Sequence, residues 1–136
     1  MRTILFLSMI LAASIAGVQN KLTVVVDGIE KSSGKVLVAV YDSIHFQKRA
    51  LYYGWANVGQ DQDEVTIVIE DVAPGRYAVA VFHDDNDNGK LDTGSYGIPI
   101  EKYGFSNNAK GAMGPPAFQD CMITIEEDTE INITVR

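Results

Sequence analysis

Short runs of apolar, β-branched residues, separated by turn-forming residues, recur along the chain. Two of these runs, 65–69 and 131–135, alternate apolar and polar residues, which is typical of a strand with one buried face. Turn formers such as Asp27-Gly28 and Pro74-Gly75 bound the runs. Together they predict strands at residues 22–26, 36–41, 65–69, 77–82, 122–125 and 131–135. Because no long helical period accompanies them, we expect an all-β fold with a single antiparallel β-sandwich.

Residues 73–79 predict a turn that leads directly into a strand. This stretch resembles the pattern found in transthyretin-like and immunoglobulin-like sandwiches, and the resemblance implies a sandwich of that type.

The predicted strands at 36–41 and 77–82 are apolar on both faces. Each carries valines on one face and small alanines on the other. A sandwich strand needs only one buried face, so another segment must cover the alanine face. One candidate is segment 42–54, with a short helix that carries a stripe of Ile44, Leu51, Tyr52 and Trp55; the other is the long stretch after His83. A mildly apolar outer face or a dimer interface are the alternatives.

The N-terminus has the three parts of a secretory signal peptide. Arg2 supplies the positive charge, residues 4–13 are apolar, and Ser14 and Ala16 are the small residues of a cleavage site. We therefore expect residues 1–16 to be removed, with cleavage in the region 16–20, and residues 17–136 to form one exported domain, periplasmic or extracellular. The apolar run is too short for a membrane span.

Composition narrows the class of protein further. The 136 residues include 11 basic and 18 acidic ones, a formal charge of −7, and 46% are hydrophobic. That is enough for one core, while the sparse, scattered basic residues argue against nucleic acid as a partner. The single cysteine, Cys121, cannot form an internal disulfide and lies beside apolar residues, so we expect a buried, inert thiol.

Residues 84–117 form a long stretch without a clear secondary-structure pattern. They contain six of the twelve glycines and three of the four prolines. A segment of this length exceeds the usual loop in a compact domain, and its aromatic residues argue against disorder. We therefore expect a long ordered loop after the fourth predicted strand, held by something other than secondary structure.

The start of this loop, 84–92, predicts a calcium site. Asp84, Asn86 and Asn88 alternate as oxygen donors, Gly89 permits a sharp turn, and Asp92 can close the shell. These residues match the first part of an EF-hand loop, but Ser95 stands where that loop has its bidentate glutamate. The predicted ligands are Asp84, Asn86, Asn88, the Lys90 carbonyl, Asp92 and, for the missing carboxylate, Glu101. The alternative is a solvated acidic turn, although a net charge of −3 within nine residues argues against a bare turn.

A calcium-ordered loop would present a rigid surface of aromatic and amide side chains. Its members are Tyr96, Tyr103, Phe105, Asn107 and Asn108. Such a surface suits a glycan or a peptide or protein segment of the cell envelope, through ring stacking and amide hydrogen bonds. Alternatively, the aromatic residues pack onto the alanine face and the calcium is structural.

Two other functions compete with a calcium-ordered module. One is an envelope scaffold or assembly subunit without a metal, which pairs through a strand edge or an apolar face. The other is a hydrolase that uses region 83–106, with His83, Asp84 and Ser106. Adjacent strand residues point to opposite faces, and no nucleophile elbow is present. We therefore assign no catalytic residue.

Several motifs of the chain occur together in a known family. They run from Val79 through Asp92, continue with Gly97-Ile98-Pro99 and Glu101, and end with 103–108 and 114–118. With these motifs the chain resembles the bacterial exported domain-of-unknown-function family 2141. The resemblance implies a single secreted or periplasmic domain and no assigned activity.

Overall fold

The structure, a computed structural model, describes residues 19–136. The predicted signal peptide, 1–16, lies outside these residues. Across 19–136, no helix has the length and apolar character needed to cross a membrane.

The described part of the chain is built from short strands. Their bounds are β1 Asn20–Asp27, β2 Lys35–Tyr41, β3 Tyr52–Asn57, β4 Val65–Val72, β5 Gly75–Asp84, β6 Tyr103–Phe105, β7 Ile123–Ile125 and β8 Thr129–Thr134. The helical elements are short: the 3₁₀ turns η1 (Ser95–Gly97) and η2 (Ser106–Asn108), and α1 (Phe118–Cys121). The predicted all-β class is confirmed.

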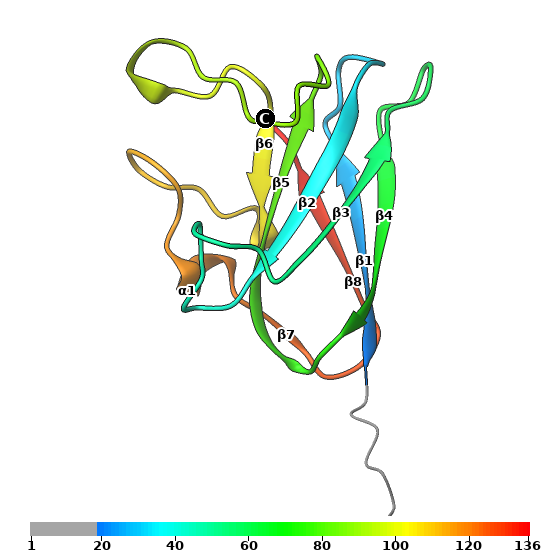
Figure 1. Cartoon of the computed structure of the whole chain (residues 1–136), viewed down its shortest axis with the longest axis vertical. Helices are drawn as coiled ribbons and strands as arrows, with labels where there is room; N and C mark the ends of the chain where they lie inside the picture. The colour runs from blue at the N-terminus through cyan, green and yellow to red at the C-terminus, as the bar shows by residue number, and fades with distance from the viewer. Residues whose placement is uncertain (1–18) are drawn as a thin grey trace, which may run out of the picture.

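The strands form two sheets that face each other (Figure 1). One has the order β4-β1-β8, the other β3-β2-β5-β6, and β7 pairs with the opposite end of β5. All pairings between named strands are antiparallel except β1 with β8, which run parallel. The parallel pair arises because the chain leaves β7 and crosses to the other sheet before β8 begins. The sandwich predicted from the sequence is consistent with this arrangement.

The core lies between the two sheets. Leu22, Val24 and Val26 of β1 meet the valines of β2 and β5 there, and all are almost completely buried. Their alternation with outward-facing residues follows from the two-residue period of a strand. Burial of these side chains is the main stabilising contribution to the fold.

The candidate helix in segment 42–54 does not form. Residues 52–57 form β3, which pairs with β2 so that Trp55 lies opposite Leu37 and Tyr53 opposite Ala39. Aromatic residues fit a pleated surface well, and pairing with β2 satisfies backbone groups that a short isolated helix leaves open. Ile44, expected on the apolar stripe of the helix, is 73% exposed.

The alanine face of β5 is covered at Ala78 and only partly at Ala80. Ala78, Phe105 and Cys121 are buried in a second apolar cluster, against which Phe46, Ala80, Ala109 and Phe118 pack. Most of the covering residues come from the long stretch after His83, and Phe46 comes from the turn after β2. We call these seven residues the cover cluster.

A buried hydroxyl ties the cover cluster to the sheet. The Val79 N–H donates to Ser106 Oγ at 2.9 Å, and the Ser106 hydroxyl donates to the Cys121 carbonyl at 2.5 Å. Ser106 is fully buried, so water cannot replace either partner.

Ser106→Ala should lower the free energy of unfolding by about 1–3 kcal/mol, because it leaves a buried N–H and a buried carbonyl unpaired. Urea denaturation measures the change. Ser95→Ala, at an exposed position, is the control and should unfold at the wild-type midpoint. Equal midpoints for the two variants would contradict the role given to Ser106.

Cys121 should be unreactive in the folded protein. Burial, with a smaller effect of Asp120, raises the pKa of the Cys121 thiol to about 11, and the reactive species is the thiolate. At pH 8 we expect no labelling by a thiol reagent until urea unfolds the chain. Rapid labelling of the folded protein would show that the cover cluster opens readily.

Candidate functional site

The predicted calcium loop begins where β5 ends. Asp84, the last residue of β5, is fully buried, and its carboxylate accepts hydrogen bonds from two backbone groups of the loop. Oδ1 accepts from the Asn88 N–H at 3.1 Å and Oδ2 from the Gly89 N–H at 2.7 Å. Gly89 has a φ of +79°, a left-handed conformation that glycine adopts without strain. Asp84 thereby folds the chain back on itself.

Two asparagine amides meet the Asp92 carboxylate inside the loop. Asn86 Nδ2 donates to Oδ2 at 2.6 Å, and Asn88 Nδ2 donates to Oδ1 at 2.7 Å. These hydrogen bonds lower the pKa of the Asp92 carboxyl group, and the bond from Asn88 has the larger effect. The N–H of Lys90, two residues after Asn88, donates to Asn88 Oδ1 at 3.1 Å. Two of the three predicted alternating donors, Asn86 and Asn88, therefore lie around the Asp92 carboxylate, whereas Asp84 bonds to the loop backbone.

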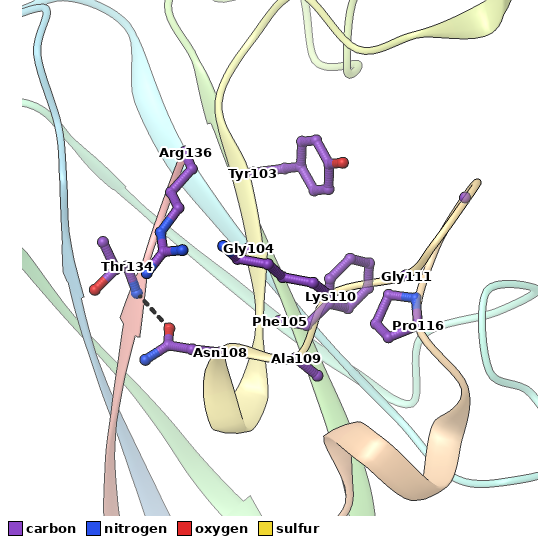
Figure 2. A pocket seen from close by; sticks show the side chains of 11 residues that line it. Tyr103, Gly104, Phe105, Asn108, Ala109, Lys110, Gly111, Pro116, Thr134 and Arg136 are labelled. Carbon is purple, nitrogen blue, oxygen red and sulfur yellow. Dashed lines mark hydrogen bonds between the residues drawn. The ribbon is translucent and has the colours of Figure 1, made fainter.

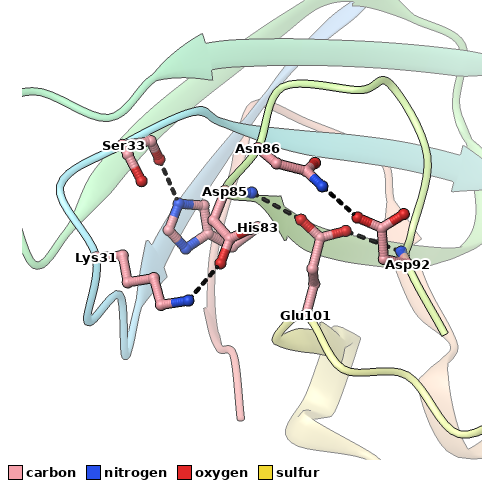
Figure 3. A network of polar contacts seen from close by, with 7 residues as sticks. All are labelled: Lys31, Ser33, His83, Asp85, Asn86, Asp92 and Glu101. Carbon is pink, nitrogen blue, oxygen red and sulfur yellow. Dashed lines mark hydrogen bonds and ion pairs between the residues drawn. The ribbon is translucent and has the colours of Figure 1, made fainter. Parts of the chain in front are cut away.

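Glu101 reaches the loop from outside, and Figure 3 shows its carboxylate between the two ends of the loop. Oε2 accepts from the Asp85 N–H and Oε1 from the Asp92 N–H, each at 2.8 Å. Glu101 is 6% exposed, and this burial raises the pKa of its carboxyl group. The sequence predicted Glu101 as the missing carboxylate ligand; in the structure both of its oxygens accept backbone N–H groups of the loop.

Two lysines neutralise other carboxylates of the loop. Lys31 Nζ pairs with Asp85 and Lys35 Nζ with Asp87, each at 2.9 Å. The hydrogen bond from Lys31 lowers the pKa of Asp85. The ion pairs relieve part of the charge that the sequence concentrates here. They involve neither Asp84 nor Asp92, the two predicted aspartate ligands.

The turn between β1 and β2 supports the base of the loop. Gly34 has a φ of +70°, and a Cβ there would lie 1.9 Å from the Asp84 carbonyl oxygen, so only glycine allows this approach. The buried His83 ring donates from Nε2 to the Ser33 carbonyl at 2.7 Å, as Figure 3 shows. His83 therefore links the end of β5 to the turn between β1 and β2.

Each carboxylate of the loop has its own donors. In keeping with this, no three histidine, cysteine, aspartate or glutamate side chains within residues 19–136 converge closely enough to hold a metal on their own. Oxygen ligands for a cation would have to include the asparagines. A half-turn of each amide about its last bond exchanges nitrogen for oxygen at almost the same place.

Three of the five predicted ligand-binding residues, Tyr103, Phe105 and Asn108, line one cleft, and Tyr96 and Asn107 do not belong to its lining. Tyr96 is fully exposed, whereas Phe105 belongs to the cover cluster. Asn107 Nδ2 donates to the carbonyls of Asp120 and Met122, and Asn108 Oδ1 accepts the Thr134 N–H. Tyr103 and Phe105 lie together, with ring centroids 6.1 Å apart.

The residues of the hydrolase alternative are also separate. Ser106 bonds to Val79, and His83 lies four residues further along β5, roughly 13 Å away at the rise of a strand. The Ser106 hydroxyl and the Nε2 atom of His83 both bond to backbone carbonyls.

Beside the loop lies an apolar groove that the sequence reasoning missed. It occupies the outer face of the β3-β2-β5-β6 sheet, where the cover cluster ends, and has a volume of about 380 Å³. Leu91, from the predicted calcium loop, lines it together with Trp55. The apolar outer faces of β2 and β5 were a signal for such a surface, but its walls come from β3 and β6, which were not predicted.

One comparison with known proteins gives a match. The model of a family described as an uncharacterised protein conserved in bacteria, DUF2141, matches residues 24–133. No curated protein matches the chain, and no solved structure does.

Glu101→Gln should loosen the loop. One carboxylate oxygen becomes an amide NH₂ that faces a backbone N–H, either of Asp85 or of Asp92, so one buried hydrogen bond is lost. We expect the free energy of unfolding in EGTA to fall by about 1–3 kcal/mol, measured with urea. The control Glu126→Gln, at an exposed position, should not change the free energy of unfolding. An unchanged urea midpoint for Glu101→Gln would contradict the role of Glu101 in joining the two ends of the loop.

Proposed function

We propose that this chain, which belongs to the DUF2141 family of bacterial proteins, is an exported, non-catalytic β-sandwich module whose 84–92 loop binds one calcium ion. The ion would fix the loop and the segment that runs from it to Glu101. One observation carries the proposal. The side-chain amides of Asn86 and Asn88 both contact the Asp92 carboxylate, with N···O distances of 2.6 and 2.7 Å.

The chemistry of the loop favours a hard cation. Asp84, Asn86, Asn88, Asp92 and Glu101 offer carboxylate and amide oxygens, the donors that calcium prefers. Each oxygen of Asp84 and Asp92 accepts one hydrogen bond from the loop and keeps a second lone pair. When the two amides turn, Asn86 and Asn88 present oxygens beside the Asp92 carboxylate, and Asn88 gives up its hydrogen bond from the Lys90 N–H. Asp84 and the Lys90 carbonyl would complete the ligands from the loop.

The distribution of the lysines also supports a cation. Lys31 and Lys35 pair with Asp85 and Asp87, at positions between the proposed ligands. Within residues 19–136, neither Asp84 nor Asp92 makes an ion pair, and their hydrogen-bond donors come from the loop itself. A calcium ion would supply a direct positive partner for these two carboxylates, and Glu101 would close the site.

Export and the absence of catalysis are part of the same proposal. The signal-peptide pattern of residues 1–16 supports export. A calcium site of the affinity common in extracellular modules, with Kd of about 10⁻⁴–10⁻³ M, would fill outside the cytoplasm. Because Ser106 and His83 serve backbone groups at separate places, we assign them positioning roles.

Thermal unfolding in EGTA and in calcium tests the proposed site. At ten to a hundred times Kd, calcium should add about 1.4–2.7 kcal/mol, a rise in Tm of roughly 5–10 °C. Magnesium, which requires a tighter octahedral shell, should raise Tm less.

Two aspartate variants make the test specific to the ligands. Asp92→Asn should abolish the rise, whereas Asp87→Asn, which removes the same charge from the same loop, should retain it. An equal rise in both variants would mean that calcium only screens surface charge. No rise in wild-type protein at tens of millimolar calcium would overturn the proposal.

A further inference from the structure

The apolar groove is built from two cross-strand rows on the outer face of one sheet. The pairing of β3, β2, β5 and β6 aligns Trp55, Leu37, Phe82 and Tyr103 in one row and Tyr53, Ala39, Ala80 and Phe105 in the next. In the second row, small alanines between Tyr53 and Phe105 make the hollow, and Leu37 and Phe82 of the first row border it. From β3 to β6 the rows span three strand spacings, roughly 14 Å.

Every residue that lines this groove is uncharged, in a chain of which 21% is charged. Trp55 is 58% and Tyr53 79% exposed, so large rings stand open to solvent beside the alanine floor. Contiguous apolar surface of this kind marks a binding site. The volume of about 380 Å³ is in the range of small-molecule sites.

A second hollow adjoins the groove across β6 and has the opposite character. This cleft, of about 250 Å³, is lined by two cationic side chains, Lys110 and Arg136. Figure 2 shows both extending into the space beside Gly104. Reciprocal backbone hydrogen bonds between Arg136 and Tyr103, at 3.0 and 3.3 Å, fix Arg136 there. Groove and cleft share Tyr103, Gly104 and Phe105 as lining residues.

The charges of the cleft are available to a ligand. Lys31, Lys35 and Lys102 make ion pairs with carboxylates, but no ion pair among the described residues involves Lys110 or Arg136. In a chain with 18 acidic and 11 basic residues, a hollow lined by two basic side chains and no acidic one is selective for an anion.

We propose that groove and cleft together bind one anionic amphiphile, a single-chain fatty acid. Its carboxylate lies between Lys110 and Arg136, where a charge-assisted hydrogen bond to the guanidinium is available. Its acyl chain crosses Tyr103 and lies on the alanine floor toward Trp55, over a distance comparable to an extended dodecyl chain.

The groove and the cleft together favour a fatty acid over the ligands that either hollow would suggest alone. A neutral glycan would leave both cations without a partner, and a small anion would leave the apolar groove open. A second copy of the chain carries the same formal net charge of −7, so charge repulsion between the copies would oppose its docking. Calcium is not required, since only Leu91 of the loop lines the groove.

Trp55 is the single tryptophan of the chain and reports directly on the groove. Its fluorescence should change saturably with dodecanoate below the micelle concentration, at one equivalent per chain, in EGTA. Decanoate should bind about tenfold more weakly, because two buried methylene groups are lost. Acetate should give no change.

Charge-matched variants test the cleft. Lys110→Gln with Arg136→Gln should weaken dodecanoate binding by about tenfold or more and leave binding of neutral dodecanol unchanged. The control, Lys21→Gln with Arg76→Gln, removes the same charge at exposed positions outside both hollows and should bind as wild type. In the groove, Tyr53→Ala should weaken binding of both ligands, whereas Tyr96→Ala should not.

The outcomes separate this proposal from the calcium site. Saturable dodecanoate binding in EGTA that depends on the cleft supports it, whether or not calcium raises Tm. It is overturned if dodecanoate gives no saturable change, if both charge variants weaken binding equally, or if neutral oligosaccharides such as maltohexaose shift the Trp55 signal and dodecanoate does not.

Discussion

The structure depends on one constraint, which is that β5 is apolar on both faces. Valines of β5 enter the core between the sheets, while Ala78 and Ala80 need a second cover. Exposing that face would forfeit the hydrophobic stabilisation of a central strand, so the chain after β5 has to return across it. The cover cluster provides this second cover. Hydrogen bonds between Ser106 and both Val79 and Cys121 hold the cluster against the sheet.

The other features follow from how the chain makes that return. Leaving β5 at Asp84, it turns sharply through the Asp84–Asp92 loop and comes back as β6, with Glu101 joining the ends of the loop. The cover stops short of Leu37 and Phe82, and the uncovered part of the face is the apolar groove. The proposed calcium site and the proposed fatty-acid site are thus two consequences of one long connection.

The sequence predicts what local pattern determines. The alternation at 65–69, the two apolar faces of 77–82 and the position of Glu101 beside the loop were all accessible from spacing and residue type. β3 was not, because Tyr52 and Trp55 fit an amphipathic turn as well as a strand, and pairing with β2 decided between them. Ser106 and Cys121 meet only through tertiary folding, and no local signal links them to β5. The groove requires the register of four strands, two of which were not predicted.

The central claim is that the long connection is organised where it begins, around the carboxylates of the Asp84–Asp92 loop. An amide-resolved NMR titration of the protein with calcium tests it most directly. The account predicts saturable shifts of residues 84–92 and of Glu101, including side-chain amide signals of Asn86 and Asn88, with one ion per chain. Shifts scattered over surface carboxylates, without saturation and without change at the two asparagine amides, would contradict it.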